Sequence, residues 1–165
     1  MAAPTRLLEF ELPADWVDYN DHLNDACHAI AFSRAGDAFL ERIGLGDAGR
    51  AATGRTAYTL GLIIRYHAEA RLGERIAISL QILESDAKRV RFWLEARRVD
   101  DDQVISTSEQ VLICVDRTGP RPRAAEFPPA VGAALRAIAL DHADLATPPE
   151  AGRGLALRRG PEKPA

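Results

Sequence analysis

The chain lacks the features that would place a protein outside the reducing interior of a cell. It has only two cysteines, Cys27 and Cys114, and both lie inside apolar runs, where reduced core thiols fit better than a disulfide. It has no N-terminal run long enough for a signal peptide and no apolar stretch long enough to span a membrane. We therefore expect a cytoplasmic protein.

The chain also has no excess of charge of one sign. Its formal net charge is −3 at pH 7, and no cluster of lysine and arginine is interleaved with aromatic residues. This pattern argues against a general nucleic-acid surface.

Metal-binding spacings are absent as well. A calcium loop that began at Asp18 would place Leu23 at the invariant glycine position and Ala29 at the bidentate glutamate position, so the pattern fails. The four histidines form no H-E-x-x-H motif and have no paired cysteines beside them. We expect neither a metal site nor a cofactor.

The composition fits one globular domain. A chain of 165 residues with 47% apolar residues is long enough to build a core but too short for a second catalytic domain. We expect this domain to cover residues 1–143. Proline, glycine and arginine become frequent beyond Asp144 and periodicity is lost, which predicts a frayed or disordered tail over 144–165.

One stretch organises the rest of the chain. Asp18, Asn20, His22 and Asn24 alternate along the run just before a segment that is mostly small and apolar and ends at Gly44. That segment predicts a long helix inside the fold, with Asn24 as N-cap, Asp25 in the first turn and Gly44 as C-cap. The polar cluster would then lie at the positive end of a buried helix, where an anion or a developing oxyanion is stabilised.

The other elements indicate an α+β fold. Five segments have strand patterns, the run from Gly46 to Gly54 reads as a loop, and Pro128-Pro129 can open a second helix over about 128–141. The four consecutive later strands predict an antiparallel meander, covered on one face by the long helix. The expected strands are 7–12, 58–66, 76–82, 89–97 and 104–115.

The run Asp18-Tyr19-Asn20-Asp21-His22-Leu23-Asn24 resembles the D-Y-N-G-H-M-N signature of the 4-hydroxybenzoyl-CoA-thioesterase-like branch of acyl-CoA thioesterases. The resemblance covers about residues 8–127. It implies a hotdog fold, in which an antiparallel five-stranded sheet wraps around a long buried helix. Three softer runs, over 65–74, 86–89 and 108–112, look most similar to the betainyl-CoA thioesterases of carnitine catabolism. The chain departs from the signature at Asp21 in place of glycine and Leu23 in place of methionine, and His28 stands where an aromatic tyrosine is common.

The resemblance also implies roles for the polar cluster. Asp18 would attack the thioester carbonyl or act as general base toward water, and the backbone N–H of Asp25 would polarise the carbonyl. His22 and Asn24 would orient groups of the loop, and Asn20 would fix Asp18. The alternatives stay open at this point: these residues can also simply cap a helix and build a turn. Cys27 can be considered as a nucleophile beside His22, but an apolar helical face raises the pKa of a thiol.

A betainyl group carries a trimethylammonium, which aromatic faces bind with about 0.5–2 kcal/mol per contact. Candidates for this contact are Trp16, Tyr19, Phe32, Tyr66 and Trp93, with Glu69 or Glu109 as counter-charge. Core or dimer packing explains Phe32 and Trp93 better. Glu109 lies within an apolar strand, where an unpaired carboxylate would be costly.

The expected function is therefore hydrolysis of a short acyl-CoA, with betainyl-CoA as the leading substrate. A thioesterase for an aromatic or medium-chain acyl-CoA is one alternative, and a non-catalytic acyl-CoA-binding hotdog module is another. The resemblance further implies pairing of edge strands across a two-fold axis, with the site at the subunit interface. We expect a homodimer or homotetramer.

Overall fold

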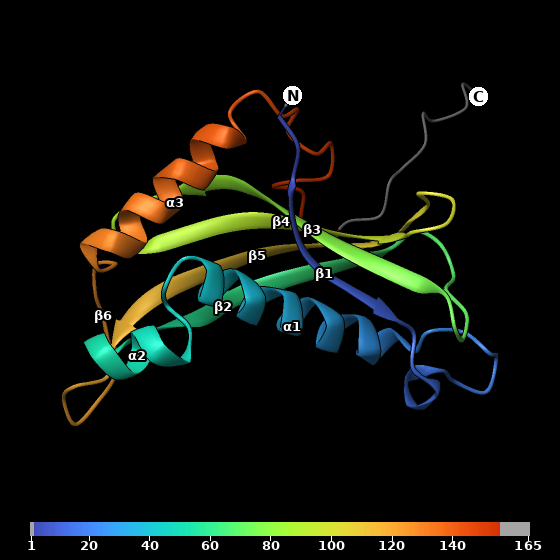
Figure 1. Ribbon diagram of the computed structural model, residues 1–165, viewed down its shortest axis with the longest axis horizontal. Coiled ribbons are helices and arrows are strands. Elements are labelled where there is room, and N and C mark those ends of the chain that lie inside the picture. Colours follow the sequence, from blue (N-terminus) through green and yellow to red (C-terminus); the bar gives the residue numbers. More distant parts are fainter. Residues whose placement is uncertain (1, 156–165) are drawn as a thin grey trace, which may run out of the picture.

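The computed structural model describes residues 2–155 as a curled antiparallel sheet with a long helix along one face (Figure 1). The main strands lie side by side in the order β1-β3-β4-β5-β2, and the two-residue β6 pairs with β5. This arrangement matches the expected α+β architecture. The elements are β1 Thr5–Glu11, the 3-10 turn η1 Ala14–Trp16, α1 Asp25–Arg42, α2 Asp47–Thr53, β2 Arg55–Tyr66, β3 Arg75–Ser85, β4 Arg89–Arg98, β5 Val104–Asp116, β6 Arg123–Ala124 and α3 Pro129–Asp141.

The core lies between α1 and the inner face of the sheet. Phe92 of β4 meets Phe39 of α1 edge to face, with ring centroids 5.3 Å apart, a geometry that aromatic quadrupoles favour. The predicted division of β4 is confirmed, because its apolar side chains are buried while its arginines are partly exposed on the outer face. The inner residues of β3 and β4 are Ile76, Ile78, Leu80, Ile82, Val90, Phe92, Leu94 and Ala96.

Helix α1 begins and ends where the sequence predicts. Asn24 caps it by accepting the N–H of Ala26 at 2.9 Å, and Gly44 follows it with a φ of 78°, a left-handed conformation that glycine adopts without cost. Its side chains Phe32 and Phe39 are fully buried against the sheet. The opposite side is less enclosed than a helix apolar on most faces suggests, because Ile30 stays 43% exposed.

The prediction of a four-stranded meander is wrong in one connection. Strands β3, β4 and β5 do follow one another, but β2 pairs with β5, from Arg55 opposite Asp116 to Tyr66 opposite Ser106. Strand β1 takes the place beside β3. The reason is the connection 67–74, which does not turn back as a hairpin but passes the start of α1, where Ala70 accepts the N–H of Leu23 at 2.8 Å.

Strand β2 is consequently an edge strand with apolar side chains exposed in the single chain. Tyr58, Leu60 and Leu62 are between 41% and 59% exposed, and a bulge at Leu60 interrupts the simple alternation. None of the helices within residues 2–155 is long and apolar enough to cross a membrane.

The segment between α1 and β2 differs from expectation. The predicted loop 46–54 contains the short helix α2, whose Asp47 pairs with Arg50 and which ends at Gly54 with a φ of 65°; alanines and this local pair favour a helical turn over a loop.

The part of the predicted tail over residues 144–155 makes hydrogen bonds to the sheet. It lies against the outer face of the sheet, where the carbonyl of Ala146 accepts from Gln81 and the N–H of Gly152 donates to Glu109. The remaining part of the predicted tail, 156–165, lies outside the described residues. The second helix is found as α3, with Val131 and Leu135 buried.

Candidate functional site

The stretch before α1 folds into a tight loop that returns the chain to the helix start. Val17 and Leu23 form a β-bridge, the N–H of Asp18 donates to the carbonyl of His22 at 2.9 Å, and the N–H of Asp21 donates back to the carbonyl of Asp18 at 3.0 Å. Asp21 takes a φ of 61°. Aspartate tolerates this left-handed conformation better than most residues, so it can replace the signature glycine without opening the loop.

The loop holds the carboxylate of Asp18 with backbone donors. Oδ1 accepts the N–H of Asn20 at 2.8 Å and lies 3.4 Å from the N–H of His22. The hydrogen bond from the Asn20 backbone is the main cause that holds the pKa of Asp18 below its usual value. Asp18 is therefore an ionised, positioned carboxylate at neutral pH, the state that a nucleophile or a general base requires.

The first turn of α1 offers a backbone donor close in sequence to this carboxylate. The side chains of Asn24 and Asp25 both accept the N–H of Ala26, at 2.9 and 2.8 Å. The N–H of Asp25 itself has no hydrogen-bond partner within residues 2–155. A free N–H at a helix N-terminus is suited to an oxyanion, as the sequence predicts for Asp25.

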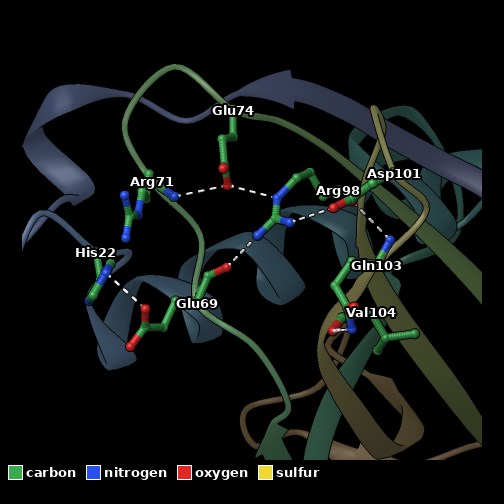
Figure 2. Close-up of polar contacts among 8 residues, drawn as sticks. All are labelled: His22, Glu69, Arg71, Glu74, Arg98, Asp101, Gln103 and Val104. Atoms are coloured by element: carbon green, nitrogen blue, oxygen red, sulfur yellow. Dashed lines mark hydrogen bonds and ion pairs between the residues drawn. The ribbon is translucent and has the colours of Figure 1, made fainter.

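His22 faces the connection 67–74 (Figure 2). Its Nε2 lies 2.9 Å from Oε2 of Glu69, and His22 also forms a β-bridge with Arg71. The His22 side chain is 25% exposed and that of Glu69 is 68% exposed, so the pair lies at the surface of the loop. The structure thus brings together two residues with separate predicted roles, a histidine that orients the loop and a substrate counter-charge.

Tyr66 at the end of β2 completes the wall beside the helix start. Its hydroxyl donates to the carbonyl of Asp25 at 3.3 Å, and its ring packs edge-on against His28 with centroids 5.0 Å apart. The ring is 56% exposed and remains accessible to a ligand.

His28 and Ser106 are polar residues near the site for which the sequence predicts no role. His28 is a buried residue of α1, and its Nδ1 lies 2.8 Å from the hydroxyl of Ser106. Burial lowers the pKa of His28 to about 4, so the ring is neutral at pH 7. Helical spacing predicts that His28 lies on the buried stripe with Phe32 and Phe39. It does not predict the partner on β5, Ser106.

Two of the predicted substrate contacts, Tyr19 and Trp16, differ in their exposure to solvent. Tyr19 is 96% exposed on the loop. Trp16 is buried, packs against Phe10 at 5.6 Å, and has the guanidinium of Arg34 at 4.8 Å from its ring centre. Because a cation of the chain itself occupies that face, the structure argues against Trp16 as a site for a substrate cation.

Glu109 is not part of this cluster. It lies on the outer face of the sheet, where its Oε1 binds Nη1 of Arg91 at 2.7 Å and its Oε2 accepts the N–H of Gly152 at 2.8 Å. These partners offset the cost of a mid-strand carboxylate and support a structural role for Glu109 beside the predicted substrate contact.

Within residues 2–155 the cysteines and the acidic side chains form neither a thiolate nucleophile nor a metal site. Both thiols are free, Cys27 half-buried and Cys114 buried, and burial raises the pKa of Cys27, which argues against a thiolate nucleophile. Within residues 2–155 no group of three or more metal-ligating side chains converges.

The chain is similar to known thioesterases. It is 35% identical over 92% of its length to a betainyl-CoA thioesterase of Pseudomonas aeruginosa, of which it covers 95%. It is also 35% identical over 96% of its length to an L-carnitine dehydrogenase/betainyl-CoA thioesterase of Rhizobium meliloti, but it spans only 31% of that longer protein. A crystal structure of a putative thioesterase from Pseudomonas putida superposes with a TM-score of 0.81 at 31% identity, covering 95% of this chain and 99% of that one.

The family model described as the thioesterase-like superfamily matches residues 12–135, a range that runs from the end of β1 to α3 and includes the loop, α1 and all of the sheet from β2 to β6. With the hotdog arrangement, the Asp18 loop and these relatives in agreement, the chain belongs to the thioesterase-like superfamily.

Proposed function

We propose that this protein is an acyl-CoA thioesterase that hydrolyses betainyl-CoA to glycine betaine and CoA in carnitine catabolism. The observation that carries this proposal is the ionised carboxylate of Asp18, which the backbone of its loop holds, together with the free N–H of Asp25 that follows it in sequence at the start of α1. Two relatives at 35% identity, a betainyl-CoA thioesterase and an L-carnitine dehydrogenase/betainyl-CoA thioesterase, support the substrate. We infer that it acts in the cytoplasm and needs no metal or cofactor.

Two routes use the same groups. In the first, Asp18 attacks the thioester carbonyl, the C–S bond breaks, CoA leaves as its thiolate, and water hydrolyses the mixed anhydride. In the second, Asp18 takes a proton from water as the water attacks the carbonyl, and the C–S bond then breaks to release CoA as its thiolate. In both routes the N–H of Asp25 binds the developing oxyanion, and loss of one such donor typically costs about 10²–10³ in rate.

The remaining polar residues orient this pair. Asn20 holds Asp18 through its backbone N–H and Asn24 fixes the first turn of α1. His22, set by Glu69, keeps the return of the loop in place. Each acts on geometry, where small displacements have large effects on rate.

We further propose that the trimethylammonium of the substrate lies near the exposed rings of Tyr66 and Tyr19, with Glu69 as the counter-charge. Cation–π contacts and a nearby carboxylate suit a permanent cation that cannot donate hydrogen bonds. The neutral state of His28 behind Tyr66 avoids placing a like charge beside it.

The exposed edge of β2 supports self-association. An edge strand that presents Tyr58, Leu60 and Leu62 to solvent is a template for pairing with a second chain. We propose a homodimer through β2, or a tetramer of such dimers, with the acyl-CoA site completed near Tyr66 at the end of that strand.

Release of free thiol from a panel of acyl-CoA substrates tests the proposal. The panel contains betainyl-CoA, 4-hydroxybenzoyl-CoA, octanoyl-CoA and acetyl-CoA, and we expect kcat/KM to be highest for betainyl-CoA. The matched control is the neutral isostere of the betainyl group, 3,3-dimethylbutanoyl-CoA, which has the same shape without the charge.

Equal rates with the charged and neutral isosteres would remove the cation-reading role of Tyr66 and Glu69. A preference for the aromatic or medium-chain substrate would keep the thioesterase and reject betainyl-CoA. Binding of acyl-CoA with no thiol release from any substrate would indicate the non-catalytic module.

A further inference from the structure

A single arginine at the end of β4 binds the connection that faces His22. Arg98 donates from Nη2 to the main-chain carbonyl of Glu69 at 2.7 Å and from Nε to the carboxylate of Glu74 at 2.9 Å (Figure 2). Its third contact joins Nη1 to Oδ2 of Asp101 at 2.7 Å. The side chain is only 20% exposed, so all three edges of the guanidinium are committed to the protein.

These contacts fix the two halves of the connection 67–74 to each other. Oε2 of Glu74 accepts from Arg98 and also from the backbone N–H of Arg71 at 3.0 Å, so the second half closes on itself. The first half is held where Arg98 meets the Glu69 carbonyl. A planar guanidinium can satisfy several acceptors at fixed relative positions, which a lysine cannot do.

The side chain of Glu69 extends from this fixed carbonyl to His22. Its Oε2 lies 2.9 Å from Nε2 of His22, and its backbone is the point that Arg98 holds. At 68% exposure the Glu69 side chain has little packing of its own, so its position depends on the backbone that carries it.

We propose that Arg98 is a positioning residue for the candidate site, acting through Glu69 on the ring of His22. The link to turnover rests on the thioesterase function proposed above, whereas the structural relay from Arg98 to His22 does not. A carboxylate oxygen at this distance accepts a hydrogen bond from the ring, so Glu69 holds His22 with a proton on Nε2.

The test compares Arg98→Ala with Arg97→Ala in the full chain. Arg97 is a close control, because it lies on the same strand and binds the same turn. Its Nη1 donates to the carbonyl of Asp102 at 2.7 Å, and its Nε donates to the carboxylate of Glu95 on β4 at 2.6 Å. It does not contact the connection 67–74. Three quantities are measured for each: kcat and KM, the ¹⁵N chemical shifts of the His22 ring, and hydrogen exchange over 67–74.

We expect Arg98→Ala to lower kcat about 10-fold with a smaller change in KM, to change the ¹⁵N chemical shifts of the His22 ring, and to speed exchange over 67–74. Arg98→Lys keeps the charge without the fork and should give an intermediate result. Arg97→Ala should leave all three readouts unchanged, even if it lowers the thermal midpoint.

A double-mutant cycle decides whether the effect passes through Glu69. If it does, Arg98→Ala added to Glu69→Ala lowers kcat no further than Glu69→Ala alone. Additive losses, or unchanged ¹⁵N chemical shifts of the His22 ring in Arg98→Ala, would overturn the proposal. If the wild-type protein releases no thiol at all, the thioesterase function fails, but the chemical-shift and exchange readouts still test the relay.

Discussion

The loop before α1 and the outer face of the sheet use acidic side chains in opposite ways. Asp18 is held by backbone N–H groups, and within residues 2–155 no arginine or lysine forms an ion pair with it. Glu109 on the outer face is bound by Arg91 and by the N–H of Gly152. The first carboxylate keeps its charge available for a reaction, whereas the second has its charge neutralised to hold the fold together.

Exchanging each carboxylate for its amide should separate these two roles most clearly. Asp18→Asn should lower the rate of thiol release by about 10²–10⁴, because the nucleophile or base is lost, while the thermal midpoint changes little. Glu109→Gln should keep the rate and lower the free energy of unfolding by about 1 kcal/mol. The measurements are thiol release and thermal unfolding of both variants. Full activity in Asp18→Asn would contradict the assigned chemistry.

Acid should destabilise the core under α1 before it discharges Asp18. The pKa of His28 is lowered to about 4 in the folded chain by burial, so between the ordinary value near 6.5 and about 4 the unfolded chain binds a proton that the folded chain does not. Stability therefore falls as pH decreases through this range, by about 3 kcal/mol, since one pKa unit is worth about 1.4 kcal/mol.

His28→Phe should flatten this part of the stability curve, measured by denaturant unfolding at several pH values. His142 is the matched comparison, because its pKa is also lowered by burial but it lies at the end of α3, where its ring contacts Thr5 of β1 and Ile82 of β3. A curve for His28→Phe with the wild-type slope would assign the pH dependence elsewhere. Asp18, whose pKa is lowered, should keep its charge throughout this range.

A smaller effect than that of His28 is expected in the segment that covers the outer face. Gly152 has a φ of 74°, so Gly152→Ala should destabilise the chain by about 1–2 kcal/mol through backbone strain and loosen the contact to Glu109. Gly154→Ala is the control, because Gly154 has open space around it and no positive φ. Thiol release should be unchanged in both variants. Faster proteolysis at Arg153 in Gly152→Ala alone would confirm the anchoring.

The parts of the site that depend on near neighbours could be predicted from the sequence. The cap at Asn24, the position of Asp18 and the free N–H of Asp25 follow from the order of residues around a helix start. The strand faces also follow, because alternation is a local property. The family resemblance added the hotdog arrangement and the role of Asp18, which composition and periodicity do not contain.

The parts that depend on distant segments could not be predicted. The partner of Glu109 is a backbone N–H far along the chain at Gly152, and the cation over Trp16 comes from Arg34 on α1. A strand pattern likewise predicts which face of the strand is apolar but not which strand lies next to it. The meander prediction therefore pairs β2 with β3, whereas β2 pairs with β5.

The pairing of β2 with β5 also sets an order of events during synthesis. Strand β2 leaves the ribosome well before its partner β5. It therefore stays unpaired, with its apolar side chains exposed, while β3 and β4 form and pair locally. Such long-range closure is slow compared with hairpin formation, and an unpaired apolar edge is prone to aggregation in the meantime. Because Tyr66 reaches Asp25 from the end of β2, the wall beside the helix start is assembled only when β5 arrives, and a nascent chain released before that point would carry the Asp18 motif without a finished site.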